Sequence, residues 1–327
     1  MAVVTNTFQS TSAVGNREEL SDVVNRITPE DTPIYSSIGT SSAKSTNPEW
    51  EVDVLAAPGA NVQLEGDTFD FAAITPPVRV GNHTQILRKD WVVSNTQDAV
   101  DNAGRNEKTK EVKLKRGIEL RKDVEFSIVS NVASVAGATR VSGGLPSWYT
   151  SNVSRGATGA NGGFSSGVTT VASAGTKRAF TKTLLDTTMQ AAYQSGANVK
   201  RAVVSPYVKS VFTTFMSDSN VASFRYAAST GSNTILATAD VYEGDFGKVM
   251  IIPNRVMAGS AAVASNVHLI DPDMLSWKWL RKIANVKDLA NVSDAKKGVL
   301  LGEGALCVKN EAGLGVVADV FGLTAST

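Results

Sequence analysis

Residues 49–54 read Glu49-Trp50-Glu51-Val52-Asp53-Val54, a strict alternation of acidic and apolar side chains. This period of two is typical of a strand with one charged face and one buried face. Extended sequence returns at Val78-Arg79-Val80 and resumes at residues 84–87. Turn-forming residues punctuate the connection between the two stretches: Pro58-Gly59, Gly66 and Pro76-Pro77. The pattern predicts a projecting two-stranded arm that rests on a neighbour, because an isolated hairpin is marginally stable in water. A hairpin inside a larger sheet is the alternative.

The segment before this arm, residues 1–46, is rich in Ser, Thr and Asn. One short helical patch places Leu20, Val23 and Val24 on a single face, and Pro29 ends it. Because so little apolar surface cannot form a core, we expect an N-terminal arm that is ordered by lying on something else.

The longest helical candidate follows the two-stranded arm and covers residues 97–136. Its apolar stripe recurs at helical spacing and consists of Leu120, Val124, Ile128, Val132 and Val135. Between residues 105 and 125, eight basic side chains outnumber five acidic ones. A charged helix face is usually just solvated. The interleaved acids, with no aromatic residue among the basic ones, argue against nucleic-acid binding here.

From Gly137 to Gly175 the sequence turns to Gly, Ser, Ala, Thr and Asn. This composition predicts a long exposed loop or insertion, with residues 150–172 open to solvent. It is not a phosphate-binding loop, because no Gly-Lys-Ser or Gly-Lys-Thr follows the glycines.

The second half of the chain mixes short apolar runs with amphipathic segments. Leu185, Met189 and Ala192 mark a helix that stops at Gly196, and Ser205-Pro206 begins another helix. The inner face of this next helix comprises Val208, Val211, Phe212, Phe215 and Met216. Buried strands are predicted at residues 202–204, 249–252, 267–270, 299–301, 305–308 and 316–318. Because helices and strands are segregated, the predicted fold class is α+β.

Nothing in the composition indicates catalysis. The 327 residues include a single cysteine, Cys307, and two histidines, His83 and His268, that lie far apart in the sequence. We expect Cys307 to be a small buried hydrophobe and both histidines to be structural. Asp271-Pro272-Asp273 suggests a turn more than a metal site. We therefore assign no catalytic residue, no cofactor and no metal, and we do not expect an enzyme.

The balance of charge is close to neutral, with 32 basic and 31 acidic side chains, and does not mark a nucleic-acid binder. No apolar run approaches the length of a membrane span, and the N-terminus lacks the features of a secretory signal. We expect a soluble protein made in a reducing cytoplasm, without a membrane partner.

Recognisable short motifs occur in order along almost the whole chain. Those before the long helix are residues 15–20, residues 28–33, Gly39, Glu49-Trp50, Asn61, Glu65-Gly66, Arg79, Gly81-Asn82 and residues 84–86. Those that lead into the helix, lie in it or follow it are Val93-Ser94, Thr96-Gln97, Gly104-Arg105, Arg121, Asp123, Glu125, residues 143–148, Asp271, Trp277, Glu303, Leu306 and residues 310–312. Together they resemble the major capsid proteins of tailed phages with the Johnson fold, the Hong Kong 97 phage type. The chain departs from this pattern at Pro48, where a polar residue is expected.

The resemblance implies a division of the α+β fold into four parts. Residues 1–46 correspond to an N-terminal arm and residues 47–93 to an extended β-hairpin loop that reaches over a neighbouring subunit. Residues 94–177 and 267–327 correspond to a peripheral domain with a long spine helix and a Gly/Ser-rich insertion. Residues 178–266 correspond to an axial domain.

The function implied by the resemblance is structural. Copies of the chain would assemble as pentamers and hexamers into the icosahedral head shell of a tailed phage, enclosing double-stranded DNA without sequence-specific binding. Assembly would take place in the host cytoplasm, with cement, portal and scaffold proteins as further partners, and the chain would end up in the virion. The shell of a cellular nanocompartment with the same fold is one alternative, and a soluble α+β enzyme is a more distant one.

Charge suggests which residues meet between subunits. Within the extended loop, residues 45–87 have six acids against one arginine, a local charge of −5, whereas the helix segment 105–125 has a charge of +3. Residues 45–87 contain no lysine, so the loop has no amine for an isopeptide bond and we expect non-covalent contacts. The contact candidates are Glu49, Trp50, Glu51, Asp53, Glu65, Asp67 and Asp70 on the loop, and Lys113, Lys115, Arg116 and Arg121 on the helix.

Overall fold

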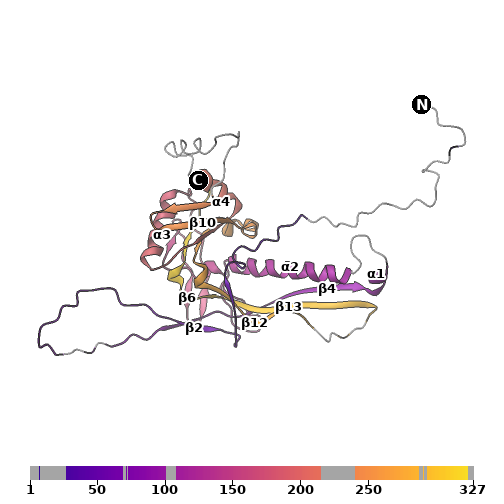
Figure 1. Ribbon diagram of the computed structural model, residues 1–327, viewed down its shortest axis with the longest axis horizontal. Helices are drawn as coiled ribbons and strands as arrows, with labels where there is room; N and C mark the ends of the chain where they lie inside the picture. The colour runs from indigo at the N-terminus through magenta and orange to yellow at the C-terminus, as the bar shows by residue number, and fades with distance from the viewer. Residues whose placement is uncertain are drawn as a thin grey trace.

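A four-stranded sheet and a six-stranded sheet form the body of the protein, and a hairpin projects from it (Figure 1). The computed structural model describes residues 7, 27–68, 71, 73–100, 108–214, 240–286, 290 and 293–322. Among them, no helix is both long and apolar enough to cross a lipid bilayer.

The four-stranded sheet has the order β1-β12-β13-β4. Its strands are β1 (Gly39–Ser42), β4 (Gln85–Ser94), β12 (Leu275–Asn285) and β13 (Ala295–Val308). The long strand β13 runs antiparallel to both β12 and β4, and β1 lies parallel to β12 at the edge. The two strands expected at 299–301 and 305–308 are therefore one continuous strand.

The long helix α2 (Lys108–Val129) covers one face of this sheet. Leu120, Val124 and Ile128 are fully buried, which confirms this part of the predicted apolar stripe. On β13, Gly298 leaves room for the indole ring of Trp91, because a Cβ at this position would overlap the ring.

The helix is shorter than predicted. A separate helix, α1 (Asn95–Ala99), precedes it, residues 101–107 lie outside the described residues, and α2 ends at Val129. Val132 and Val135 are 40% and 44% exposed and do not extend the stripe. Their backbone N–H groups bond non-helically, to the carbonyl oxygens of Ser130 and Val141, so the chain has already turned.

The six-stranded sheet has the order β5-β14-β11-β8-β10-β9. Its strands are β5 (Val153–Ser154), β8 (Arg201–Val204), β9 (Val241–Gly244), β10 (Gly247–Pro253), β11 (Val267–Ile270) and β14 (Gly315–Val317). Strands were expected at four of these places. The sheet combines strands from 178–266 with β5, β11 and β14, which come from segments outside this range.

Two amphipathic helices, α3 (Lys182–Gln194) and α4 (Pro206–Thr214), pack their apolar faces with one face of the six-stranded sheet. The hydroxyl of Ser205 accepts a hydrogen bond from the N–H of Val208 at 3.3 Å, which confirms the predicted cap of α4. Phe215 and Met216, also expected on its inner face, lie outside the described residues.

A single apolar cluster joins the two sheets. It contains Val203 and Ile270 of the six-stranded sheet together with Trp277 and Leu306 of the four-stranded sheet. Short helical turns complete the body: η2 (Leu145–Ser147), η4 (Arg255–Gly259), α6 (Ala261–Ala264), η5 (Pro272–Met274) and η6 (Glu311–Gly313). The two sheets therefore share one core.

The Gly/Ser-rich segment after α2 is packed and not simply exposed, so the expectation for residues 150–172 is wrong in part. It contains the two-stranded ribbon β6 (Gly163–Ser165) and β7 (Val168–Thr170). Asn152, Thr169 and Ala172 are at most 4% exposed. Hydrogen bonds take the place of apolar contacts here, since the Asn152 side-chain amide donates to the carbonyl oxygens of Ala312 and Leu314.

The N-terminal segment joins the core of its own chain. Ile34 and Ile38 are 0% and 6% exposed, and β1 follows directly. The buried carboxylate of Glu125 on α2 accepts hydrogen bonds from the N–H groups of Ile34 and Tyr35 at 3.1 and 2.8 Å. The predicted helical patch at Leu20, Val23 and Val24 lies outside the described residues.

Candidate functional site

The projecting hairpin is built from β2 (Glu49–Val52) and β3 (Val78–Gly81), which pair antiparallel with Trp50 opposite Val80. The predicted two-stranded arm is confirmed, and its long connection extends far from the body (Figure 1). The alternation of exposed and half-buried residues holds through Val52 and ends there, since Asp53 and Val54 are both exposed. The stretch at 84–87 belongs to β4, which pairs with β13 in the body.

Asn82 fixes the hairpin to the body. Its side chain is fully buried, and its amide nitrogen lies 2.7 Å from the carbonyl oxygen of Leu306 and 3.1 Å from that of Gly143. Its amide oxygen accepts from the N–H of Gly143 at 2.8 Å. Every polar atom of the amide is thus satisfied where the chain leaves β3.

A buried carboxylate secures the next turn of the chain. Glu303 on β13 accepts hydrogen bonds from Thr84 at 3.0 Å, from Arg140 at 2.6 Å and from Arg281 at 2.9 Å. Burial by itself raises the pKa of Glu303, but the hydrogen bonds from Arg140, Thr84 and Arg281 outweigh it and lower the pKa. Glu303 is therefore charged and linked to two guanidinium groups at neutral pH.

Aromatic packing holds the hairpin strand β2. The ring of Trp50 lies 5.7 Å from that of Trp148, which in turn stacks on Phe164 at 5.7 Å. The ammonium group of Lys278 lies 4.7 Å from the centre of the Trp50 ring. Trp50, a predicted contact between subunits, is thus half-buried within its own chain.

The far part of the hairpin, the loop of residues 53–77, is different. Its large apolar side chains are almost fully exposed: Val54 80%, Leu55 91%, Val62 92%, Leu64 79%, Phe71 92% and Ile74 93%. A tight turn at its centre has Gly66 at φ +83° and a hydrogen bond from the N–H of Asp67 to the carbonyl oxygen of Leu64. Monomeric proteins rarely expose so much contiguous apolar surface without an interaction partner.

The acidic contact candidates occupy both parts of the hairpin. Glu49 pairs with Arg79 at 3.3 Å on the strands, and Glu51 beside it is exposed. Asp53, Glu65 and Asp67 are exposed on the loop. Asp70 lies outside the described residues. The loop thus combines uncovered apolar groups with uncompensated negative charge.

Most of the basic candidates on α2 have partners inside the chain. Lys113 lies over the ring of Trp91 at 4.6 Å, and Arg121 lies over that of Tyr35 at 5.8 Å. Arg116 pairs with Glu119 at 2.7 Å, and Lys115 is exposed. Within one chain the acids lie on the hairpin and these bases on α2, and the hairpin loop projects from the body on the side away from α2 (Figure 1).

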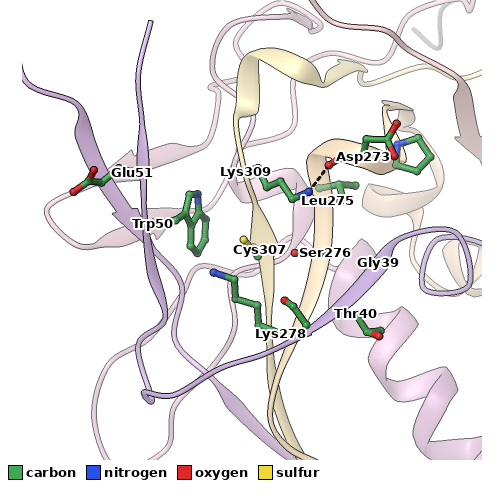
Figure 2. A pocket seen from close by; sticks show the side chains of 12 residues that line it. Gly39, Thr40, Trp50, Glu51, Asp273, Leu275, Ser276, Lys278, Cys307 and Lys309 are labelled. Atoms are coloured by element: carbon green, nitrogen blue, oxygen red, sulfur yellow. Dashed lines mark hydrogen bonds between the residues drawn. The ribbon is translucent and has the colours of Figure 1, made fainter.

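A cavity of about 530 Å³ lies between the hairpin strand β2 and the edge strand β1 (Figure 2). Lys278 and Cys307 belong to its lining, and the ammonium group of Lys309 donates to the carbonyl oxygen of Asp273 at 2.7 Å. Cys307 is 2% exposed, and burial raises the pKa of its thiol. The thiol therefore stays protonated and is a poor nucleophile, as expected of a buried hydrophobe.

His268 and Asp271 each have a hydrogen-bond partner within the chain. His268 is fully buried, its Nδ1 lies 3.1 Å from the hydroxyl of Tyr149, and burial lowers its pKa to about 4. Asp271 accepts a hydrogen bond from the N–H of Asp273, the turn predicted from the sequence. Among the described residues, no three His, Cys, Asp or Glu side chains gather as a metal site would require.

Sequence reasoning left Asn82, Thr84 and Glu303 out of the contact candidates. The available signal was a lone acid within an apolar strand run, Leu300-Leu301-Gly302-Glu303-Gly304-Ala305-Leu306. Such an acid must find buried partners, but the sequence does not say which.

Comparison with known proteins agrees with this architecture. The model of a family described as the SU10 major capsid protein matches residues 3–321. The chain belongs to this family of major capsid proteins. The major capsid protein of Escherichia phage Phieco32 is 32% identical over 127 residues, which cover 38% of this chain and 36% of that protein.

Solved structures of similar fold cover almost the whole length of this major capsid protein. The capsid of the native GTA particle has a TM-score of 0.60 and 11% identity, over 95% of this chain and 98% of that chain. A structure from Mycobacterium phage Adephagia has a TM-score of 0.60 and 12% identity, over 96% and 98%. The cyanophage A-1(L) capsid asymmetric unit has a TM-score of 0.58 and 14% identity, over 97% and 99%. At these identities the likeness shows the fold.

Proposed function

We propose that this major capsid protein builds the icosahedral head shell of a tailed phage, in which pentamers and hexamers of the chain enclose double-stranded DNA. One observation carries the proposal: a firmly rooted hairpin presents six large apolar side chains, 79% to 93% exposed, with no cover from its own chain. A second copy is the partner that a shell supplies at every position.

The four-part division belongs to the same proposal. Residues 1–46 form the arm, residues 47–93 the extended loop, residues 94–177 and 267–327 the peripheral domain, and residues 178–266 the axial domain. The strand pairing refines the extended loop, since β4 lies in the four-stranded sheet and leaves the hairpin as its projecting part. Assembly in the host cytoplasm, with portal, scaffold and cement proteins as further partners, completes the proposed role, which is structural and not enzymatic.

Contacts between the subunits are non-covalent in this proposal. An isopeptide bond needs a lysine amine, and residues 45–87 contain none. The exposed apolar groups of the loop and its acids supply burial and charge pairing instead. Each exposed pair contributes at most about 1 kcal/mol, but a closed shell repeats it around every axis.

Electron microscopy of the purified protein tests the proposal directly. We expect closed icosahedral particles, and boiled, detergent-treated particles should run as one band near 34.4 kDa. A covalent ladder under reducing conditions would exclude the non-covalent contacts, and a uniform population of small soluble oligomers would exclude the shell. DNA extracted from particles made during infection separates a virion from a cellular nanocompartment.

A further inference from the structure

We propose that the cavity between β1 and β2 is a binding site for a small organic carboxylate, a molecule with one negative charge and an apolar body. The cavity is lined by residues of a single chain, from β1, β2, η5, β12 and the end of β13 (Figure 2). Such a site is therefore complete in the subunit and is independent of the proposed shell.

Small side chains on one face of the four-stranded sheet create the cavity. Trp277 is buried in the core, so its neighbours Ser276 and Lys278 point to the opposite face. Cys307, the cross-strand partner of Ser276, shares that face. On β1, Gly39 lies opposite Ser276, and a Cβ at Gly39 would meet no atom within 4 Å. The floor of the cavity is therefore low, and its one long side chain is that of a lysine.

This lysine, Lys278, has no carboxylate to balance its charge. It is half-buried, and its ammonium group lies 4.7 Å from the centre of the Trp50 ring. Within the described part of the chain it forms no ion pair with a carboxylate. The contact with the ring supplies only part of the stabilisation that a partly desolvated ammonium group loses on leaving water. An anion beside Lys278 would supply the rest.

The other charged residues of the lining leave this imbalance in place. Lys309 donates to a backbone group, the carbonyl oxygen of Asp273, at 2.7 Å. The carboxylate of Asp273 pairs with Lys200, which is not part of the lining. The carboxylate of Glu51 points away from the ammonium groups of Lys278 and Lys309 (Figure 2). Two ammonium groups thus line the cavity without a carboxylate of their own.

The remaining lining indicates the kind of molecule that carries the charge. Trp50, Leu275 and Pro272 offer apolar surface, and the volume of about 530 Å³ falls within the range of small-molecule pockets, roughly 300–1,000 Å³. The indole N–H of Trp50 is buried and has no acceptor among the described residues. A carboxylate can accept from this N–H and from a lysine, while its apolar body lies on the walls. Inorganic phosphate has no apolar surface to bury there.

Titration of full-length subunits with benzoate tests the site. Benzoate should shift the indole N–H signal of Trp50 in NMR spectra in a saturable way, and Trp50→Phe identifies this signal. Benzamide has the same shape without the charge, and inorganic phosphate has charge without the apolar body. We expect each of them to bind at least tenfold more weakly than benzoate.

Substitutions of single lysines locate the charge that benzoate meets. Lys278→Met keeps the apolar stem and should weaken benzoate binding at least tenfold, whereas Lys278→Arg keeps the charge and should bind within threefold of wild type. Lys309→Met should weaken binding at least threefold, and it supplies a second variant if Lys278→Met does not fold. The matched control is Lys115→Met on α2, which is exposed and outside the lining and should bind within twofold of wild type.

Several results would overturn the carboxylate site. Folded wild-type subunits could show no saturable shift with benzoate, or they could bind benzamide or phosphate as tightly as benzoate. Unchanged affinity in folded Lys278→Met, or in Lys309→Met where it is the variant that folds, would show that these ammonium groups do not meet the ligand. An equal loss from Lys115→Met would show that benzoate responds only to the overall charge of the chain.

Discussion

The hairpin has two regions that differ in their contacts. We call Asn82, Thr84 and Glu303, the partner of Thr84, which fix the hairpin to the body, the root, and residues 53–77 are the loop. At the root, Asn82 and Thr84 are fully buried and bonded to body residues that lie about 60 and 220 positions away in the sequence. On the loop, Val62 and Phe71 are each 92% exposed. The polar groups of the root find their partners within one chain, whereas the apolar side chains of the loop remain exposed.

This difference separates folding from assembly within a single element. Residues at the root contribute to the stability of the subunit, because their removal leaves buried polar groups unpaired. Residues on the loop are exposed and contribute little to the stability of the isolated subunit, whereas in the proposed shell a second copy would cover them. Full burial of one large apolar side chain is then worth about 1.5–3 kcal/mol. A rigid root also lowers the conformational entropy lost when the loop docks.

The largest expected effect comes from breaking the root at Asn82. Asn82→Ala leaves the N–H and carbonyl groups of Gly143 and the carbonyl of Leu306 without this partner. We expect the unfolding free energy of the subunit to fall by about 3 kcal/mol, from roughly 1 kcal/mol for each buried group. Chemical denaturation of unassembled subunits measures the change.

Asn61 on the loop is the matched control for Asn82. It is exposed, and its hydrogen bond joins it only to Gln63, two residues on. Asn61→Ala should change the unfolding free energy by less than about 0.5 kcal/mol. If Asn82→Ala and Asn61→Ala lowered the unfolding free energy equally, root and loop would not differ in their contribution to the stability of the subunit.

The sequence predicts the parts of this arrangement that depend on local pattern. Alternation indicates the hairpin strand up to Val52, and helical spacing identifies Leu120, Val124 and Ile128 as the buried stripe of α2. The same spacing continues to Val132 and Val135, where hydrogen bonds to residues outside the helix turn the chain instead. Local sequence pattern therefore overestimates the length of the helix.

Long-range polar contacts explain the rest of what the sequence did not predict. The partner of Asn82 at Leu306 and that of Thr84 at Glu303 are over 200 positions away, and no local period encodes such a pairing. Asn152 likewise looks like a loop residue in sequence, yet it is buried because its amide bonds to the segment 312–314. A buried polar residue of this kind can be identified only when its distant partner in the three-dimensional structure is known.

A smaller effect, in the pH dependence of stability, distinguishes the root carboxylate Glu303 from the body carboxylate Glu125. The pKa of Glu303 is lowered, so its stabilisation is complete above the ordinary glutamate pKa of about 4.3 and is lost as the pH falls through the lowered value. Burial raises the pKa of Glu125 despite hydrogen bonds from Tyr35, Ile34 and Asn254. Its contribution is complete below about pH 4.3 and is lost as the pH rises through the raised value.

Substitution by glutamine tests these opposite signs. The stability advantage of wild type over Glu303→Gln should shrink on acidification below about pH 4.3, the ordinary glutamate pKa. The advantage of wild type over Glu125→Gln should grow as the pH falls toward this value from above. Denaturation of subunits across a pH series measures both differences. Parallel curves for the two variants would show that the carboxylates titrate alike.

The smallest expected effect on the fold comes from the loop, although its effect on assembly is decisive. Val62→Ser with Leu64→Ser removes two exposed apolar side chains, so the unfolding free energy of the subunit should stay within about 0.5 kcal/mol of wild type. In a shell, the same change forfeits roughly 3 kcal/mol or more at each loop contact, because each side chain would be fully buried there. Because every subunit repeats the loss, electron microscopy should show soluble subunits in place of closed particles. As a control, Val62→Ile with Leu64→Met keeps the loop apolar and should preserve assembly. If neither variant forms closed particles, the shape of the loop and not its apolar character is decisive. If the serine variant still forms closed particles, these side chains stay exposed in the shell.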